Sequence, residues 1–168
     1  MAGVKVTVKT TWGAKNSSTF QVKAKTLGGA ADELSKRDEW GKFDGNIGYD
    51  YDSDENDYVT KVTLKPSYTI SMPVWAGYKK APKACQQEWD RMYKALEKHE
   101  DGHRLIHLET LATIETALQC KTDYPASDLK TDFAQWMQDG QDNQDKFDKS
   151  TRNGANKGVE LTITDECA

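Results

Sequence analysis

The sequence has few cysteines, few prolines and no long apolar run. Its 168 residues include three Cys and four Pro. No stretch approaches the roughly 20 consecutive apolar residues that a membrane-spanning helix needs, so we expect no membrane span. Positive charge is outnumbered, because 23 Lys and Arg stand against 27 Asp and Glu, which gives a net charge of −4. A nucleic-acid-binding domain normally carries a basic surface, so we expect no nucleic-acid partner.

The odd number of cysteines leaves at least one thiol unpaired. If one unbroken helix runs from Cys85 to Cys120, the two are separated by about 50 Å at 1.5 Å per residue and cannot be bridged. The remaining possibilities are a disulfide between Cys120 and Cys167 or three reduced thiols. A disulfide between Cys85 and Cys120 stays possible only if the helix starts later or breaks. The length of the chain predicts a single domain over residues 1–168.

The most informative stretch is an H-E-x-x-H motif at residues 99–103, inside the longest helical pattern of the chain. His99 and His103 are one helical turn apart, so both imidazoles lie on the same face. This arrangement suits the Zn–N distance of about 2.0–2.1 Å without straining the backbone. Glu100 flanks the pair as a general base for a water activated by the metal. The motif therefore predicts Zn²⁺ bound by His99 and His103, with Glu100 as the catalytic residue.

The motif lies on the helix face that we expect to be buried. Apolar and aromatic residues recur at helical spacing from Trp89 to Leu118, and the motif histidines, Glu100 and His107 fall in the same stripe. Buried imidazole and carboxyl groups are costly without a partner, and a divalent cation would pair with all of them. The alternative is that these groups only hydrogen-bond one another and the backbone.

The segments around this helix predict an α+β fold. We expect strands at 4–8 and 20–24, two strands around a turn at 65–67, and a last strand at 159–163; the expected helices cover 30–37, 83 to about 120, and a stretch after an N-cap at Ser127. The expected architecture is a small antiparallel sheet packed against the long H-E-x-x-H helix and a second, C-terminal helix, which is a zincin-like arrangement.

The end of the β portion predicts where a substrate binds. Pro73 favours an edge strand or a strand end, and an edge strand beside a catalytic cleft can hold an extended peptide. We therefore expect a peptide or protein substrate to contact Met72, Val74 and Trp75.

The order of three segments resembles the DUF922 family, whose members are described as bacterial secreted zinc-dependent proteases. These segments are the M-P-V-W run at residues 72–75, residues 89–96 leading into H-E-D-G-H, and F-D-K-S-T-R-N-G at residues 147–154. The resemblance spans roughly residues 20–163, nearly the whole chain. It implies a peptidase activity and a secreted or periplasmic location, and it implies no particular substrate.

The resemblance also bears on the third zinc ligand. The family's tail motif is similar to Tyr-Asp-x-x-Thr-x-His-Gly, and this chain has Phe147 for the Tyr and Asn153 for the His. Asp148 matches the family's Asp, and its carboxylate suits a His₂-carboxylate site, although it is equally suited to capping the following turn. The alternatives are the amide oxygen of Asn153 and the imidazole of His107. His107 lies about 12 Å from His99 along a straight helix, which favours a supporting or core role.

The sequence as a whole predicts a zinc-dependent metallopeptidase. The main alternative is a degenerate zincin-like binding module whose metal site is weakened or lost, which the Asn153 replacement favours. A zinc hydrolase of non-peptide amides or esters is a third possibility, because the same metal chemistry attacks any polarised carbonyl.

Overall fold

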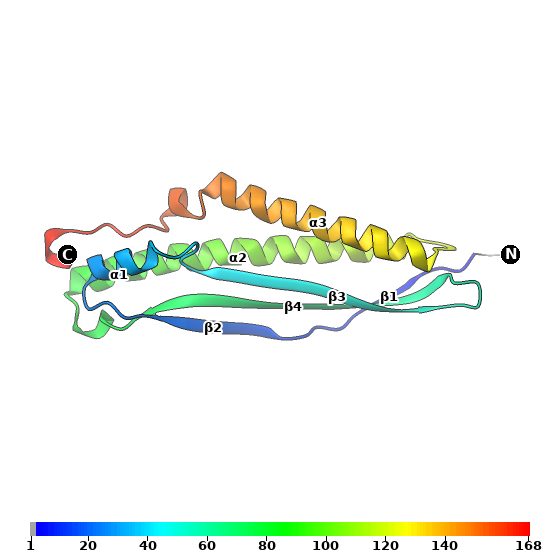
Figure 1. The fold of residues 1–168 in the computed structure, drawn as a ribbon, viewed down its shortest axis with the longest axis horizontal. Helices are drawn as coiled ribbons and strands as arrows, with labels where there is room; N and C mark the ends of the chain where they lie inside the picture. The colour runs from blue at the N-terminus through cyan, green and yellow to red at the C-terminus, as the bar shows by residue number, and fades with distance from the viewer. Residues whose placement is uncertain (1–2) are drawn as a thin grey trace. The chain divides into compact units, whose positions relative to one another are not determined.

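A computed structural model describes residues 3–168 as an α+β protein (Figure 1). Its main elements are β1 (Thr7–Thr10), β2 (Lys15–Val22), α1 (Leu27–Leu34), β3 (Lys42–Ser53), β4 (Val59–Trp75), α2 (Lys83–Gln119) and α3 (Ala126–Thr151). Short 3₁₀ turns occupy Tyr78–Lys80, Ala155–Lys157 and Asp165–Cys167. Within residues 3–168, none of the helices is long and apolar enough to cross a membrane.

The strands form a sheet in which β1, β4 and β2 are neighbours in that order, and β3 also pairs with β4. β1 pairs with β4 in parallel, with Thr7 opposite Lys61 and Thr10 opposite Leu64. The predicted α+β class is confirmed, whereas the predicted antiparallel sheet is not. Alternation along a strand reports which face is buried, and it carries no information about the direction of the neighbouring strand.

The chain divides into two compact units, and the first comprises residues 1–15, 45–68 and 104–145. Its core combines strand residues with the C-terminal part of α2 and the N-terminal part of α3: Val59, Val62, Leu64, Leu111, Ile114, Leu118, Leu129 and Phe133. Gly140 of α3 lies against Thr110 of α2, because a Cβ on Gly140 would be 2.7 Å from Thr110 Cγ2. The missing side chain therefore lets α2 and α3 approach closely in this unit.

The second unit comprises residues 16–44, 69–103 and 146–168. Its core contains α1, the end of β4 and the N-terminal part of α2: Val22, Leu27, Ala30, Leu34, Met72, Trp75, Trp89, Met92 and Leu96. α1 begins after Thr26, whose hydroxyl accepts the Gly29 N–H at 3.1 Å and caps the helix. The predicted domain over residues 1–168 stays a prediction, since both units draw on separate stretches of the chain.

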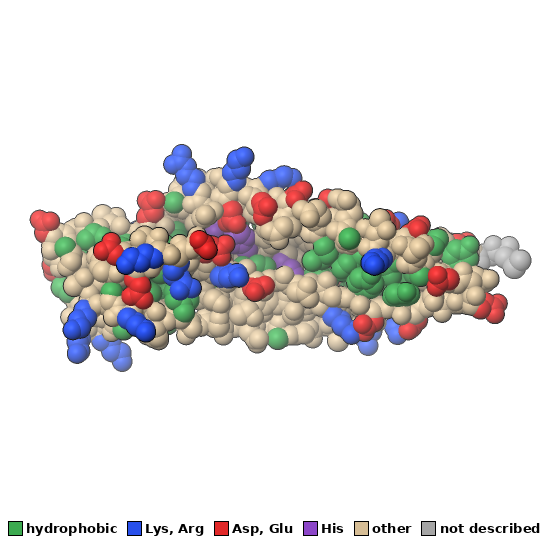
Figure 2. All heavy atoms as spheres, in the orientation of Figure 1, with side chains coloured by type: hydrophobic (Ala, Val, Ile, Leu, Met, Phe, Trp, Pro, Cys, Tyr) green, Lys and Arg blue, Asp and Glu red, His purple; other side chains and the backbone are tan. Residues whose placement is uncertain are grey.

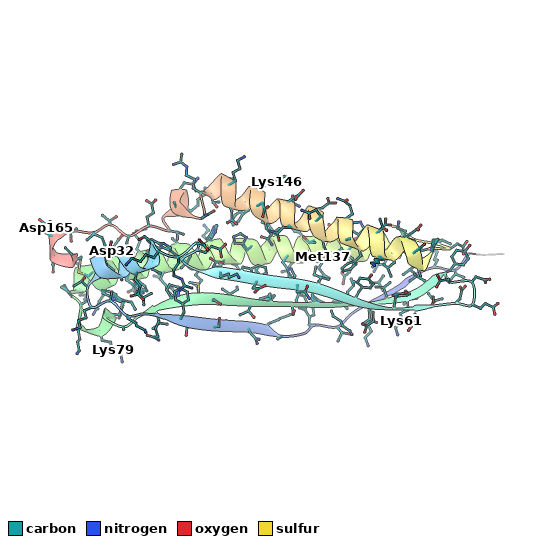
Figure 3. All side chains as sticks on the ribbon, viewed as in Figure 1. Asp32, Lys61, Lys79, Met137, Lys146 and Asp165 are labelled. Atoms are coloured by element: carbon teal, nitrogen blue, oxygen red, sulfur yellow. A yellow bond between two sulfur atoms is a disulfide. The ribbon has the colours of Figure 1, made fainter. Side chains whose placement is uncertain are left out.

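The two long helices follow the pattern of the sequence closely. α2 starts directly after Pro82 and ends at Gln119, as predicted. α3 begins at Ala126, so Ser127 lies inside the helix and is not its N-cap; the Ser127 hydroxyl bonds the Asp128 carboxylate instead. Near the other end of α3, Lys146 projects into solvent (Figure 3).

Two strand predictions are corrected. β4 runs unbroken through residues 65–67, where a turn was expected, and Pro66 is buried within it. A proline lacks only the N–H donor, and the Pro66 carbonyl still accepts the Gly13 N–H at 2.9 Å. β2 runs from Lys15 to Val22, so it begins five residues before the strand that was predicted at 20–24.

Residues 159–163 do not form the predicted last strand. Side chains of α2 bind this segment in place of a β-ladder: Arg91 donates to the Glu160 carbonyl at 2.5 Å, and the Thr162 N–H donates to the Glu88 carboxylate at 2.7 Å. Alternating residues were therefore a false strand signal, because backbone groups can be satisfied by side chains as well as by a sheet.

A disulfide joins Cys85, in the first turn of α2, to Cys167 near the end of the chain. Cys120 is exposed and free. Neither expected arrangement, Cys120 with Cys167 or three reduced thiols, is present. The pairing could not be read from spacing, because it depends on the tail returning to the start of α2.

Candidate metal centre

His99 and His103 project from one face of α2, one turn apart. They are 7% and 9% exposed, and their Nε2 atoms lie 3.2 Å apart. The two rings are nearly perpendicular, at 85°, with centroids separated by 4.8 Å. Histidine side chains are visible in the space-filling view of Figure 2, with acidic side chains beside them. Both imidazoles thus direct the same nitrogen toward one point.

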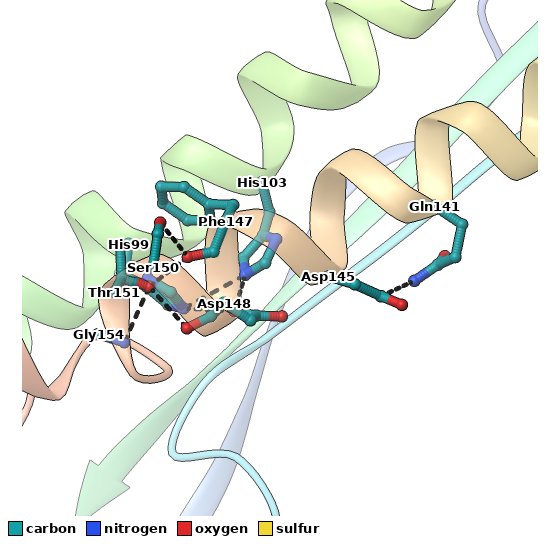
Figure 4. A network of polar contacts seen from close by, with 9 residues as sticks. All are labelled: His99, His103, Gln141, Asp145, Phe147, Asp148, Ser150, Thr151 and Gly154. Atoms are coloured by element: carbon teal, nitrogen blue, oxygen red, sulfur yellow. Dashed lines mark hydrogen bonds and ion pairs between the residues drawn. The ribbon is translucent and has the colours of Figure 1, made fainter.

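Asp148 of α3 meets both imidazoles (Figure 4). Its Oδ1 lies 3.2 Å from His99 Nε2 and 2.9 Å from His103 Nε2. Two ligand atoms of a tetrahedral zinc ion at about 2.0 Å are separated by about 3.3 Å, so this triangle is close to the size that zinc needs. His99, His103 and Asp148 form a group that could hold a metal ion.

The other two candidate ligands are placed differently. His107 belongs to the unit that contains residues 104–145, where its ring packs edge-on against Tyr68 at 6.3 Å between centroids. Burial lowers the pKa of His107, which is 5% exposed. Asn153 is exposed and has a φ of 52°, and its backbone N–H donates to the Asp148 carbonyl at 2.9 Å. The structure therefore brings Asp148, and not His107, to the histidine pair.

Two phenylalanine rings pack against the imidazoles. Phe147 of α3 stacks on His99 at 5.0 Å and 16°, and it meets His103 edge-on at 5.0 Å. A Cβ on Gly102 would lie 2.4 Å from Phe147 Cζ, so the glycine inside α2 makes room for this ring. Phe43 of β3 stacks on His103 at 6.3 Å and 13°. Among residues 3–168, His99 Nδ1 has no hydrogen-bond partner, so packing holds that ring.

The turn after α3 also supports His99, which sequence reasoning missed. The buried Thr151 hydroxyl donates to the Phe147 carbonyl at 2.8 Å and accepts the Gly154 N–H at 3.3 Å. Gly154 has a φ of 83°, and a Cβ there would lie 3.2 Å from His99 Cγ. Only glycine adopts this backbone conformation at little cost, and here it also lets the chain lie against the imidazole.

Glu100 is buried beside the first histidine, with 3% of its surface exposed. Burial raises the pKa of Glu100 to about 8, the charges of Glu39 and Asp148 add to this rise, and a hydrogen bond from the Phe43 backbone opposes it. Burial also lowers the pKa of His99, which favours the neutral imidazole that binds metals. A carboxyl group with a pKa near neutrality is suited to accept and return a proton.

A cavity of about 370 Å³ lies in the same unit as Glu100. Gly41 is part of its wall, and a Cβ on Gly41 would lie 2.6 Å from Glu100 Oε1. The Glu39 carboxylate, which acts on the pKa of Glu100, also lines the cavity. The Gly41 contact was missed because it joins a loop to a helix that is distant in sequence. Gly41 therefore joins the wall of the cavity to the predicted catalytic carboxyl group.

The predicted substrate-contacting residues have different environments. β4 is not an edge strand, because it pairs with β1, β2 and β3; Pro73 instead lies near the end of β4, which closes at Trp75. Trp75 is 3% exposed, and its indole N–H donates to the Ala24 carbonyl, so it is a core residue. Met72 is 7% exposed and borders a second cavity of about 550 Å³, and Val74 is 39% exposed. Substrate contact by Met72 and Val74 stays a prediction.

The chain matches a known protein family over most of its length. A family model described as "Bacterial protein of unknown function (DUF922)" matches residues 17–155. The chain belongs to the DUF922 family. The match includes the histidine pair, Glu100 and Asp148, and it ends before the tail that carries Cys167. No curated protein and no solved structure matches this DUF922 chain.

Proposed function

We propose that this DUF922 protein is a zinc-dependent metallopeptidase that hydrolyses peptide bonds with water. The observation that carries the proposal is the convergence of His99 Nε2, His103 Nε2 and Asp148 Oδ1 at separations of 2.9–3.2 Å. Three protein ligands leave one tetrahedral position open, which is typical of catalytic rather than structural zinc sites. Glu100 stands next to the first ligand, where a structural site would need no base.

The donor set fits zinc chemically. Two neutral imidazoles and one carboxylate are a ligand combination that catalytic zinc sites use. The bound ion would supply a Lewis acid for the substrate carbonyl and would lower the pKa of water to about 7. Phe147 and Phe43 hold the imidazoles by stacking at 5.0 Å and 6.3 Å between centroids, so the ligand positions are set before any ion binds.

Glu100 would carry the proton transfers. In the proposed mechanism its carboxylate accepts a proton from the attacking water and then delivers it to the nitrogen of the leaving amine. The Phe43 backbone N–H hydrogen-bonds the Glu100 carboxyl group and fixes its orientation. A pKa raised to about 8 by burial favours the second transfer, and a cation held by the histidines would lower this value toward the range of the first.

We also propose that the protein works outside the reducing cytosol. The Cys85–Cys167 disulfide supports this location, because such bonds persist in secreted and periplasmic proteins and are rare in cytosolic ones.

The test compares zinc content and peptide cleavage in the wild type, in Glu100→Gln and in the control Glu109→Gln. Glu109 is an exposed residue of the same helix, so its substitution makes the same Glu-to-Gln change away from the proposed site. We expect one zinc ion per chain in all three proteins. Cleavage of a quenched peptide library should fall on the order of 10²–10⁴-fold in Glu100→Gln alone, the range typical of a lost general base.

Three outcomes would contradict the proposal in different ways. Absence of zinc after loading in excess removes the metal centre. Equal cleavage by Glu100→Gln and the wild type removes Glu100 from the mechanism. Bound zinc with no cleavage of any peptide favours the degenerate binding module, and a subsequent screen of amides and esters would then test the hydrolase alternative.

A further inference from the structure

We propose that the cavity beside Glu100 is a substrate subsite for a carboxylate, which Arg37 binds with help from Lys42. The inference rests on the proposed peptidase function and adds a substrate class to it. The carboxylate can belong to an Asp or Glu side chain of the substrate or to its C-terminus, since both present the same planar group to the protein.

The position of the cavity is the first argument. Gly41 lines the cavity and is also in contact range of the Glu100 carboxyl group, at 2.6 Å from an added Cβ to Oε1. A substrate group inside the cavity therefore lies next to the residue proposed to act on the scissile bond. The volume of about 370 Å³ falls within the range of small-ligand pockets and accommodates a side chain.

The geometry of Arg37 is the second argument. Its guanidinium lies over the Phe20 ring, 3.8 Å from the ring centroid, and both residues line the cavity. Stacking on an aromatic face holds the planar fork in one orientation, and such a fork binds a carboxylate through two parallel hydrogen bonds. Among residues 3–168, neither Arg37 nor Lys42 forms an ion pair with a carboxylate. Two positive charges are thus available to a ligand.

The remaining polar groups divide the cavity. Two acidic residues, Asp38 and Glu39, also line the cavity, and of these only Glu39 acts on the pKa of Glu100, so its negative charge belongs to the catalytic side. A carboxylate would be repelled there and directed toward Arg37. The Ser18 and Ser71 hydroxyls lie 2.6 Å apart, and only one of them can donate to the other. The second hydroxyl keeps its proton for a ligand, which adds a donor to those of Arg37 and Lys42.

The first experiment measures cleavage of matched peptides by the zinc-loaded wild type, Arg37→Gln and the control Lys36→Gln. Lys36 is exposed and does not line the cavity, so both variants lose one positive charge at adjacent positions. The peptides carry Glu or Gln at each position around the scissile bond, and each is made with a free or an amidated C-terminus. We expect Arg37→Gln to lower kcat/KM for the preferred acidic peptide about 10–100-fold, the range for a lost charged hydrogen bond.

Under the proposal, cleavage of the neutral peptides should change less than about two-fold in Arg37→Gln, and Lys36→Gln should resemble the wild type with every peptide. A preference for internal Glu identifies an acidic side chain as the ligand, and a preference for the free C-terminus identifies the terminal carboxylate. Equal cleavage of acidic and neutral peptides by the wild type overturns the subsite. Equal losses in the two variants overturn it as well, because they indicate a general charge effect.

A binding measurement keeps the two proposals separable. Fluorescence anisotropy of the same peptides with metal-free Glu100→Gln protein excludes coordination of the carboxylate by zinc and requires no catalysis. We expect tighter binding of an acidic peptide than of its neutral partner, and loss of this difference when Arg37→Gln is added. If the difference is present but the wild type cleaves nothing, the subsite stands and the peptidase proposal fails. If binding shows no difference while cleavage is robust, the subsite fails alone.

Discussion

The three histidines of α2 are similarly buried but have different surroundings in the two units. His107 is 5% exposed and packs edge-on against Tyr68, and burial alone lowers its pKa. His99 and His103 are 7% and 9% exposed, and both meet the carboxylate of Asp148. Helical spacing therefore decides which face a histidine occupies, whereas a second element, here α3, decides whether it can bind a metal.

The two units can also be compared through two glycines, each of which allows a close contact between α2 and α3. In one unit, Gly102 of α2 makes room for Phe147 of α3; in the other, Gly140 of α3 makes room for Thr110 of α2. The contacts are alike in kind because each lets a side chain press on a helix backbone. Only the first contact holds a ring that stacks on a candidate ligand, His99. We therefore expect similar structural costs and different effects on the metal centre.

The largest expected effect is on zinc affinity, and it distinguishes the candidate ligand Asp148 from the buried His107. Asp148→Ala should weaken zinc binding on the order of 10²–10³-fold, because the affinity of about 10–16 kcal/mol in structural sites with four protein ligands corresponds to about 2.5–4 kcal/mol per ligand. His107→Gln should leave zinc affinity unchanged. Competition with a chromophoric chelator measures both. Equal zinc affinities for Asp148→Ala and the wild type would show that Asp148 is not a ligand.

A smaller effect is expected at the glycines. Gly102→Ala and Gly140→Ala should each lower the free energy of unfolding by about 1–3 kcal/mol, since an added Cβ overpacks a close contact. Denaturant unfolding of the metal-free proteins measures this cost. Gly102→Ala should also weaken zinc binding, whereas Gly140→Ala should not. Adding Phe147→Leu to Gly102→Ala should recover part of the lost stability and part of the lost zinc affinity. Weakened zinc binding in Gly140→Ala would contradict the assignment of distinct roles.

The smallest effect concerns pH and the buried His107. Burial lowers its pKa in the folded state below the unfolded value of 6.5. The unfolded chain then binds a proton that the folded chain does not, so the contribution of His107 to stability is present above pH 6.5 and is lost as the pH falls. Metal-free His107→Gln should therefore lose less stability than the wild type between pH 7.5 and 5. His99 titrates in both proteins, so parallel stability curves would exclude this role for His107.

Local patterns predicted the parts of the site that lie on one helix. The limits of α2, the burial of Glu100 and the shared face of His99 and His103 follow from helical periodicity. A glycine such as Gly102 is unfavourable within a helix, and the neighbour that explains it, Phe147, lies on another helix. Sequence can therefore mark a position that needs an explanation without supplying the partner that explains it.

Features that join distant segments were missed or misassigned. The parallel pairing of β1 with β4, the side-chain binding of the tail and the Cys85–Cys167 bond all depend on where the chain returns. The contact between Gly41 and Glu100 is of the same kind. Asp148 was reached only through the family motif, because nothing in its own surroundings distinguishes it from the other acids of α3.

The disulfide has a practical consequence for handling the protein. It connects points separated by 82 positions and encloses every candidate ligand within one covalent loop. A single backbone cut inside this loop leaves both fragments attached, so a nicked sample migrates as one species until the disulfide is reduced. Self-digestion within residues 85–167 would therefore be visible only on reducing gels.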